Sequence, residues 1–171
     1  MVFMRKILCV FIFVISIACI AVSQENPANM FAELFEKYKT TEFEKRSIES
    51  NLNDGMYMLI FDINKKISKD IFCQINLLAT LGQTQYLVYK KDGENIWYFH
   101  KEALFYEVPY RLENAEIKNT YLKFTNDLPY AFNDVTGKYD IQADTNRYQA
   151  ITDVRSLVKL IEIVQNAISD Y

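Results

Sequence analysis

The chain is poor in the residues from which most catalytic centres are built. It has one histidine, His100, and four glycines, which are scattered rather than grouped in a phosphate-binding loop. A metal site made of several imidazoles is therefore impossible within one chain. A nucleophilic pair of Cys73 and His100 is conceivable, but Cys73 lacks the basic or helix-start surroundings that lower a thiol pKa. We expect no catalytic residue, no metal and no cofactor, and hence not an enzyme.

Cysteines that can pair with one another are also lacking. Of the three cysteines, Cys9 and Cys19 lie in the apolar N-terminal stretch, which leaves only Cys73 beyond it. A single cysteine forms no internal disulfide, so the domain is not a disulfide-stabilised scaffold. Asn-x-Ser/Thr sequons are absent as well. Both absences suit a bacterial envelope better than a eukaryotic secretory route.

Basic clusters are missing, and the formal net charge is −3. Nucleic acid is excluded as a partner on this ground, because its binding requires grouped lysine and arginine. Aspartates recur in one region, at positions 127, 134, 140 and 144. Their spacing does not fit the alternate ligand positions of an EF-hand loop, so we interpret them as solvated carboxylates.

The N-terminus has the features of a secretory signal. Arg5 and Lys6 precede a long apolar run, and small residues precede Gln24. This arrangement predicts that residues 1–23 are a signal peptide and that residues 24–171 form a single domain of the exported protein.

Two alternatives remain open for this segment. Its apolar run is about long enough to stay uncleaved as a membrane anchor. Alternatively, Ala18 places a small residue before Cys19, as bacterial lipidation requires, although Ser16 replaces the usual leucine. Acyl chains on Cys19 would make the protein membrane-associated. A cut after Ser23 would instead release it into the periplasm or the medium.

Amphipathic helices are predicted at both ends of the domain. Asn26-Pro27 favours a helix start, because asparagine caps well and proline fits the first turn. Apolar residues then recur at helical spacing as far as Tyr38. Thr152 is a plausible cap for a closing helix whose apolar stripe continues to Ile168. Residues 42–51 are charged and are predicted to be a helical turn or a loop.

Between these helices, the residue pattern is typical of β-strands. The predicted strands are 56–63, 71–78, 86–89, 95–100, 104–108 and 117–124. Asp92-Gly93 predicts a type I′ hairpin turn, which needs a positive φ at both central positions. Residues 126–137, which contain several asparagines and aspartates, are predicted to be a long loop. The predicted fold is α+β: a curved antiparallel sheet (half-barrel) of five or six strands with an N-terminal and a C-terminal helix packed on it.

Two segments carry a family resemblance. Asp92-Gly93 is followed by Ile96-Trp97-Tyr98 and then by Tyr106-Glu107-Val108-Pro109, and the stretch from Phe124 to Gly137 forms a second motif. Together they resemble the periplasmic lipoprotein-carrier (LolA-like) superfamily of outer-membrane lipoprotein-sorting proteins. The resemblance implies an incomplete barrel lidded by helices, and the carriage of lipid or acylated lipoprotein between membranes.

The leading hypothesis is an exported, non-enzymatic envelope protein that binds an apolar ligand in a half-barrel cleft. Rings of the sheet would line the cleft, and the N-terminal helix would be a partial lid. The predicted ligand-binding residues are Trp97, Phe99, Tyr106, Phe124, Phe31, Leu34 and Phe35. The alternative is a filled core in a secreted protein–protein interaction module, whose sheet edge or acidic loop meets a protein partner.

Overall fold

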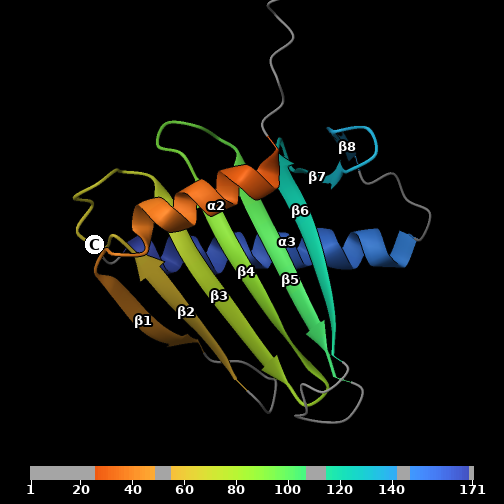
Figure 1. The fold of residues 1–171 in the computed structure, drawn as a ribbon, viewed down its shortest axis with the longest axis horizontal. Helices are drawn as coiled ribbons and strands as arrows, with labels where there is room; N and C mark the ends of the chain where they lie inside the picture. Colours follow the sequence, from red (N-terminus) through yellow and green to blue (C-terminus); the bar gives the residue numbers. More distant parts are fainter. Residues whose placement is uncertain (1–25, 49–54, 107–114, 142–146, 170–171) are drawn as a thin grey trace, which may run out of the picture.

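The structure is a computed structural model that describes residues 26–48, 55–106, 115–141 and 147–169. It is an α+β fold with two helices and an open, eight-stranded antiparallel sheet (Figure 1). The elements in chain order are α2 (Pro27–Tyr38), β1 (Phe43–Ile48), β2 (Met56–Phe61), β3 (Ile71–Ala79), β4 (Gly82–Lys90), β5 (Trp97–Phe105), β6 (Glu116–Thr125), β7 (Leu128–Asn133), β8 (Lys138–Ile141) and α3 (Arg147–Ser169). The predicted signal, its cleavage point and Cys19 lie outside the described residues.

Helix α2 begins as the sequence predicts. The Asn26 side chain accepts a hydrogen bond from the Ala28 backbone N–H at 2.9 Å, and Pro27 occupies the first helical position. Asn26 thus satisfies one of the backbone N–H groups at the helix start, and Pro27 has no N–H group that would need a partner. The residues Phe31, Leu34 and Tyr38 are buried at helical spacing, so most of the predicted apolar stripe faces the sheet; Phe35, which was predicted as part of it, is exposed.

The sheet is a simple meander in which each strand pairs with its neighbours in sequence. Its eight strands exceed the predicted five or six. The charged residues 42–51, expected to be a helical turn or a loop, contain β1 instead. Strand β1 is an edge strand, where charged side chains are tolerated and discourage pairing with other chains. Its charge therefore hid it from a search for apolar alternation.

Strands β7 and β8 were also missed, because residues 126–137 were predicted to be a loop. Thr125 pairs with Leu128, so Asn126 and Asp127 form a two-residue hairpin connection. Both have a positive φ, of 51° and 61°. This is the type I′ geometry, and asparagine and aspartate tolerate it better than most residues.

The turn at Asp92-Gly93 differs from its prediction. Only Gly93 has a positive φ, of 76°, which is the pattern of a type II rather than a type I′ turn. The Glu94 N–H donates to the Lys91 carbonyl, and β4 and β5 are joined by a six-residue connection rather than a two-residue one. Strand β5 continues to Phe105, so it includes the start of the strand that was predicted separately at 104–108.

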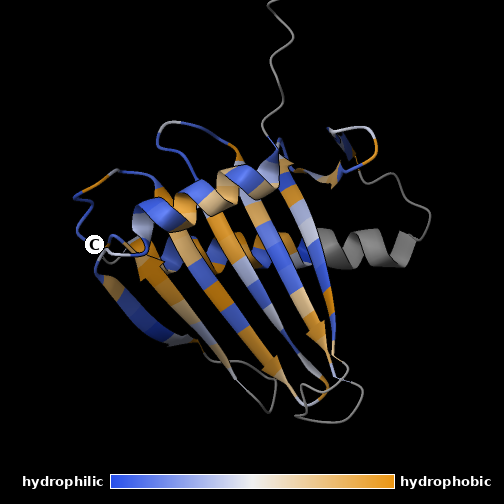
Figure 2. Ribbon diagram, in the orientation of Figure 1, coloured by the Kyte–Doolittle hydropathy of each residue, from blue (hydrophilic) through white to orange (hydrophobic). Residues whose placement is uncertain are grey.

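The two helices lie on opposite faces of the sheet (Figure 1). The face under α3 carries the larger core, in which Met58, Ile75, Val88 and Phe99 pack with Val164. The face under α2 carries a smaller core, formed by Phe31, Leu34, Tyr38, Phe72 and Leu87. Figure 2 shows the corresponding alternation of hydrophobic and hydrophilic residues along the central strands.

A close backbone approach fixes the β3–β4 connection. Ala79 pairs with Gly82, and Gly82 lies opposite Phe105 in the next strand. A Cβ atom at Gly82 would collide with the Leu104 carbonyl oxygen. Only glycine fits this position without displacing β5.

We predict that Gly82→Ala lowers the free energy of unfolding by about 1–3 kcal/mol, because the backbone of β5 must move. Thermal and urea denaturation measure this change. Gly93→Asn is the matched control, since no atom lies within 4 Å of its Cβ position and asparagine tolerates the positive φ. Equal losses in both variants would contradict the proposed collision.

Candidate functional site

The predicted ligand-binding rings are divided between the two faces of the sheet. Trp97, Phe99 and Phe124 are 4%, 0% and 8% exposed, and they belong to the core under α3. Phe31 and Leu34 are buried on the opposite face, between α2 and the sheet. The sheet itself therefore separates the two groups, and they do not line a common cleft.

The other two predicted residues lie apart from both groups. Phe35 lies at the flank of the buried stripe of α2 and is 44% exposed. Tyr106 follows the end of β5, is half-buried, and donates its backbone N–H to the Leu81 carbonyl at 3.0 Å. Neither residue belongs to the buried core on either face of the sheet.

A pocket of about 420 Å³ lies between α2 and the ends of β4 and β5 that lead to the Gly93 turn. We call it the α2 pocket. Its apolar and aromatic lining is Met30, Leu34, Tyr89 and Tyr98, and its charged lining is Glu33, Lys37, Lys91 and Glu94. The volume falls within the range of roughly 300–1,000 Å³ found for small-molecule sites.

Two tyrosines form the floor of the α2 pocket. Tyr89 and Tyr98 are cross-strand partners, and their rings stack with centroids 6.3 Å apart. Burial, followed by the nearby Asp70 carboxylate, raises the pKa of Tyr89 to about 12. Burial, followed by Glu94, also raises the pKa of Tyr98. Both hydroxyl groups are therefore protonated at neutral pH and can donate hydrogen bonds.

Asp70 ties α2 to the sheet beside this pocket. Its carboxylate accepts the Asp92 backbone N–H at 3.0 Å and the Tyr89 hydroxyl at 3.5 Å, and it lies 3.6 Å from the Lys37 ammonium. Burial acts to raise the pKa of Asp70. The Asp92 N–H, Ser68 and Lys37 outweigh that effect and hold the pKa below its ordinary value.

The charged residues of the α2 pocket place positive and negative groups close together. The Lys91 ammonium lies 3.1 Å from a Glu94 carboxylate oxygen at the turn, while Lys37 approaches from α2. Exposed pairs of this kind contribute little to stability. They leave cationic and anionic groups available to the polar end of a bound molecule.

The structure does not bring Cys73 and His100 together. Cys73 is fully buried under α3, where burial raises its pKa to about 12. His100 points to the α2 face and stacks on Tyr121 with ring centroids 4.7 Å apart. Within the described ranges, no group of three or more His, Cys, Asp or Glu side chains is placed to hold a metal ion. Of the predicted solvated aspartates, Asp144 lies outside those ranges.

Sequence reasoning did not identify the α2 pocket. Alternation placed Leu87 and Tyr89 on one face of their strand, and helical spacing placed Met30 on the stripe of α2. Neither pattern states which helix covers which face. Local periodicity does not show which distant residues pack together, so it could not place Met30 beside Tyr89.

In comparisons with known proteins, no family model, curated protein or solved structure matches this chain. The resemblance to lipoprotein carriers therefore stays a prediction from two short motifs. In the part of the chain that the structure describes, no helix combines the length and apolar character needed to cross a membrane.

We predict that Asp70→Asn destabilises the protein at neutral pH by on the order of 1 kcal/mol, because the amide cannot attract Lys37 as a carboxylate does. The lowered folded-state pKa means that this stabilisation is present above the ordinary value of 3.8. It is lost as the pH falls through the lower folded-state pKa. The difference between wild type and variant should therefore shrink in acid.

Urea denaturation at neutral pH and at stepwise lower pH measures this difference. Asp127→Asn, at an exposed turn with a positive φ, is the control and should have little effect. A difference between wild type and Asp70→Asn that stays constant below the ordinary pKa would show that the charge of Asp70 is not responsible.

Proposed function

We propose that this protein is an exported, non-enzymatic binding protein that takes up the apolar part of an amphiphilic ligand in the α2 pocket. The observation that carries the proposal is the lining of that pocket, in which Met30, Leu34 and two tyrosine rings lie beside two lysines and two glutamates. Apolar and charged residues in one lining suit a ligand that has both an apolar and a polar part.

The proposal retains the half-barrel lipid carrier expected from the sequence but moves its site. The rings of Trp97, Phe99 and Phe124 serve the core under α3, while Phe31 and Leu34 hold α2 on the sheet. In this arrangement α2 is the wall and lid of the pocket. A lipid or the acyl chain of a lipoprotein would lie along Met30 and Tyr98, with its polar end near Lys37 and Lys91.

Such a lid can open only if the contacts between α2 and the sheet can be released. Helix α2 is held by one small core and by the Asp70 contact, and the Tyr38 ring stacks on Phe72 at 5.1 Å. The Tyr38 hydroxyl is buried and has no hydrogen-bond partner among the described residues. An unsatisfied buried hydroxyl makes this contact less stable than its buried area suggests.

We predict that Met30→Trp weakens binding of an apolar fluorescent dye by about tenfold, because the larger ring fills the α2 pocket. Delipidated protein is titrated with the dye, which is then displaced with a medium-chain fatty acid. Phe35→Ala is the matched control on the same helix, and it should bind as wild type does, since Phe35 faces away from the pocket.

Lipid extraction followed by mass spectrometry provides a second measurement. The wild type should retain acyl lipid that Met30→Trp loses. Equal dye binding by wild type and Met30→Trp, both folded by circular dichroism, would remove the α2 pocket as the site.

One observation favours the alternative of an interaction module. Large apolar side chains are exposed at the end of the sheet where Thr80 and Leu81 form the turn between β3 and β4, which we call the Thr80 turn; they are Leu78, Leu81, Phe105 and Ile117. Exposed apolar groups that share one end of a sheet can mark a contact with another protein. The edge strand β1 is a weaker candidate, because its charged residues disfavour strand addition.

If the alternative is right, one protein should be recovered in stoichiometric amount from envelope extract with wild type and lost with the double variant Leu81→Ser, Phe105→Ser. Ile141→Ser, an exposed apolar position in β8 away from this end, is the control. Recovery that is unaffected by the double variant would exclude this surface.

A further inference from the structure

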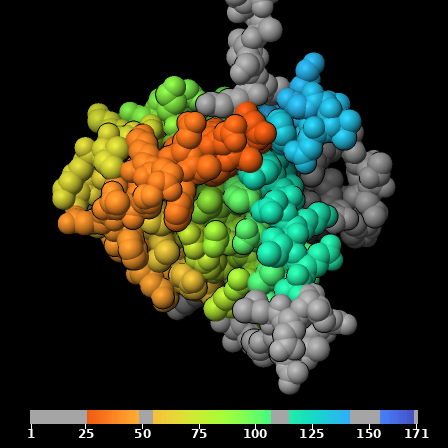
Figure 3. Space-filling model, viewed as in Figure 1, coloured from red at the N-terminus to blue at the C-terminus, as the bar shows by residue number. Residues whose placement is uncertain are grey.

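A second part of the α2 face is polar and remains open. Helix α2 crosses the strands at the end nearer the Gly93 turn, over Phe72 and Leu87. Toward the other end, Figure 3 shows β4 and β5 uncovered below the helix, between it and β6. One side chain per strand forms a row here, which we call the polar row: Tyr57, Asn76, Gln85, Glu102 and Asn119.

The strand register fixes this row. Each member pairs directly with the next: Tyr57 with Asn76, Asn76 with Gln85, Gln85 with Glu102, and Glu102 with Asn119. Five neighbouring strands at about 4.8 Å spacing make the row about 19 Å long. That length accommodates an extended chain molecule laid across the strands.

The amides of the row are held by their neighbours. Gln74 donates from Nε2 to Asn76 Oδ1 at 3.0 Å, and His100 Nε2 lies 2.8 Å from Asn119 Oδ1. His100 is itself fixed between Tyr121 and the Phe31 ring of α2, with centroids 4.7 and 5.7 Å away. The row is therefore partly pre-organised, which reduces the entropic cost of binding.

Asn76 carries the least expected feature of the row. It is only 8% exposed, and its Nδ2 has no hydrogen-bond partner within the described segments. Buried amide groups are almost always bonded, and an unbonded donor lowers stability. The chain keeps this donor although an apolar side chain of similar size would pack there at less cost.

The chemistry of the row differs from that of an ordinary solvated strand face. The same strands present Met58, Ile75 and Tyr86 to the α3 core, and the residues of the row lie on the opposite face, under α2. Within the row, the only formal charge is that of Glu102. Around Glu102 the row therefore disfavours an anionic ligand and favours a neutral ligand rich in hydrogen-bonding groups.

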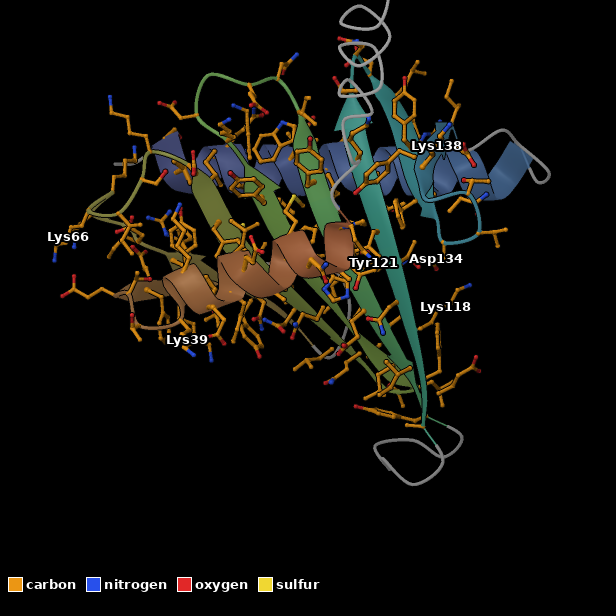
Figure 4. The ribbon with its side chains drawn as sticks, turned by 45° about the horizontal axis from the view of Figure 1, so that its top comes forward. Lys39, Lys66, Lys118, Tyr121, Asp134 and Lys138 are labelled. Carbon is orange, nitrogen blue, oxygen red and sulfur yellow. The ribbon has the colours of Figure 1, made fainter. Side chains whose placement is uncertain are left out.

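Aromatic rings lie at both ends of the row. Tyr57 is the end residue on β2, and the Lys45 ammonium lies 4.4 Å from its ring centroid. Tyr121 lies on β6, next to the N-terminal end of α2 (Figure 4). Burial, followed by Asp134 and Glu102, raises the pKa of Tyr121, so its hydroxyl remains a donor at neutral pH.

We propose that the polar row is a binding site for a neutral oligosaccharide. Each amide offers one acceptor and two donors, and neighbouring sugar hydroxyl groups need both. The Glu102 carboxylate would accept a hydroxyl proton, and the flat rings of Tyr57 and Tyr121 would meet the C–H faces of sugar rings. This site is separate from the α2 pocket, because the Leu87 and His100 positions under α2 lie between them.

The test is titration of ¹⁵N-labelled protein with cellotetraose, chitotetraose and maltotetraose, followed by nuclear magnetic resonance. At least one sugar should shift the side-chain amide signals of Asn76, Gln85 and Asn119. Gln85→Ala should weaken its affinity by about tenfold. Lys118→Ala is the matched control, because Lys118 neighbours Asn119 on β6 but points to the opposite face, and it should bind as wild type does.

Three outcomes would overturn the proposal. One is no shift with any of the sugars up to about 10 mM, a concentration at which even weak binding is detected. Another is an equal loss of affinity in Gln85→Ala and Lys118→Ala. The third is preferential binding of an anionic polysaccharide or an extended peptide. Met30→Trp should retain sugar binding, so failure of the α2 pocket and failure of the polar row are distinguished.

Discussion

The packing of α3 against one face of the sheet is the interaction on which the rest of the structure depends. Val164 and Leu157 are 0% and 2% exposed, and they meet apolar side chains from β2 to β6. A slip of one residue in any central strand would turn its core residues toward α2. The α3 core therefore fixes the register, and the register decides which residues the other face receives.

This dependence explains how much of the fold was predictable from the sequence. The apolar pattern, a continuous run for β2 and an alternation for β3, identified β2, β3 and β6 with only small errors at their ends, because each contributes to a core. It missed β1, β7 and β8, because these strands bury little apolar surface. Their sequences are marked instead by charged residues in β1 and by turn-forming residues beside β7 and β8. The Asn126-Asp127 pair forms the type I′ turn that was expected at Asp92-Gly93. A dipeptide favours a turn, but the strands that pair around it determine which turn forms.

The candidate site was less predictable, for a reason specific to this chain. Aromatic residues occur on both faces of the same strand, so Trp97 belongs to the α3 core while its neighbour Tyr98 lines the α2 pocket. Local sequence shows that these two side chains point in opposite directions. It does not show that a separate helix covers each face, because the contacts of α2 and α3 join distant parts of the chain.

The position of α2 follows from the distribution of apolar and polar side chains on the face of the sheet that it covers. At the Gly93 end, the strands present Phe72 and Leu87, which α2 covers with Phe31, Leu34 and Tyr38. Two residues further along the strands, toward the Thr80 turn, the sheet presents Gln85 and Glu102. If α2 covered these side chains, it would remove polar groups from water without supplying hydrogen-bond partners. The polar row thus confines α2 to one half of the face. The same boundary leaves the α2 pocket on one side of the helix and an open hydrogen-bonding surface on the other.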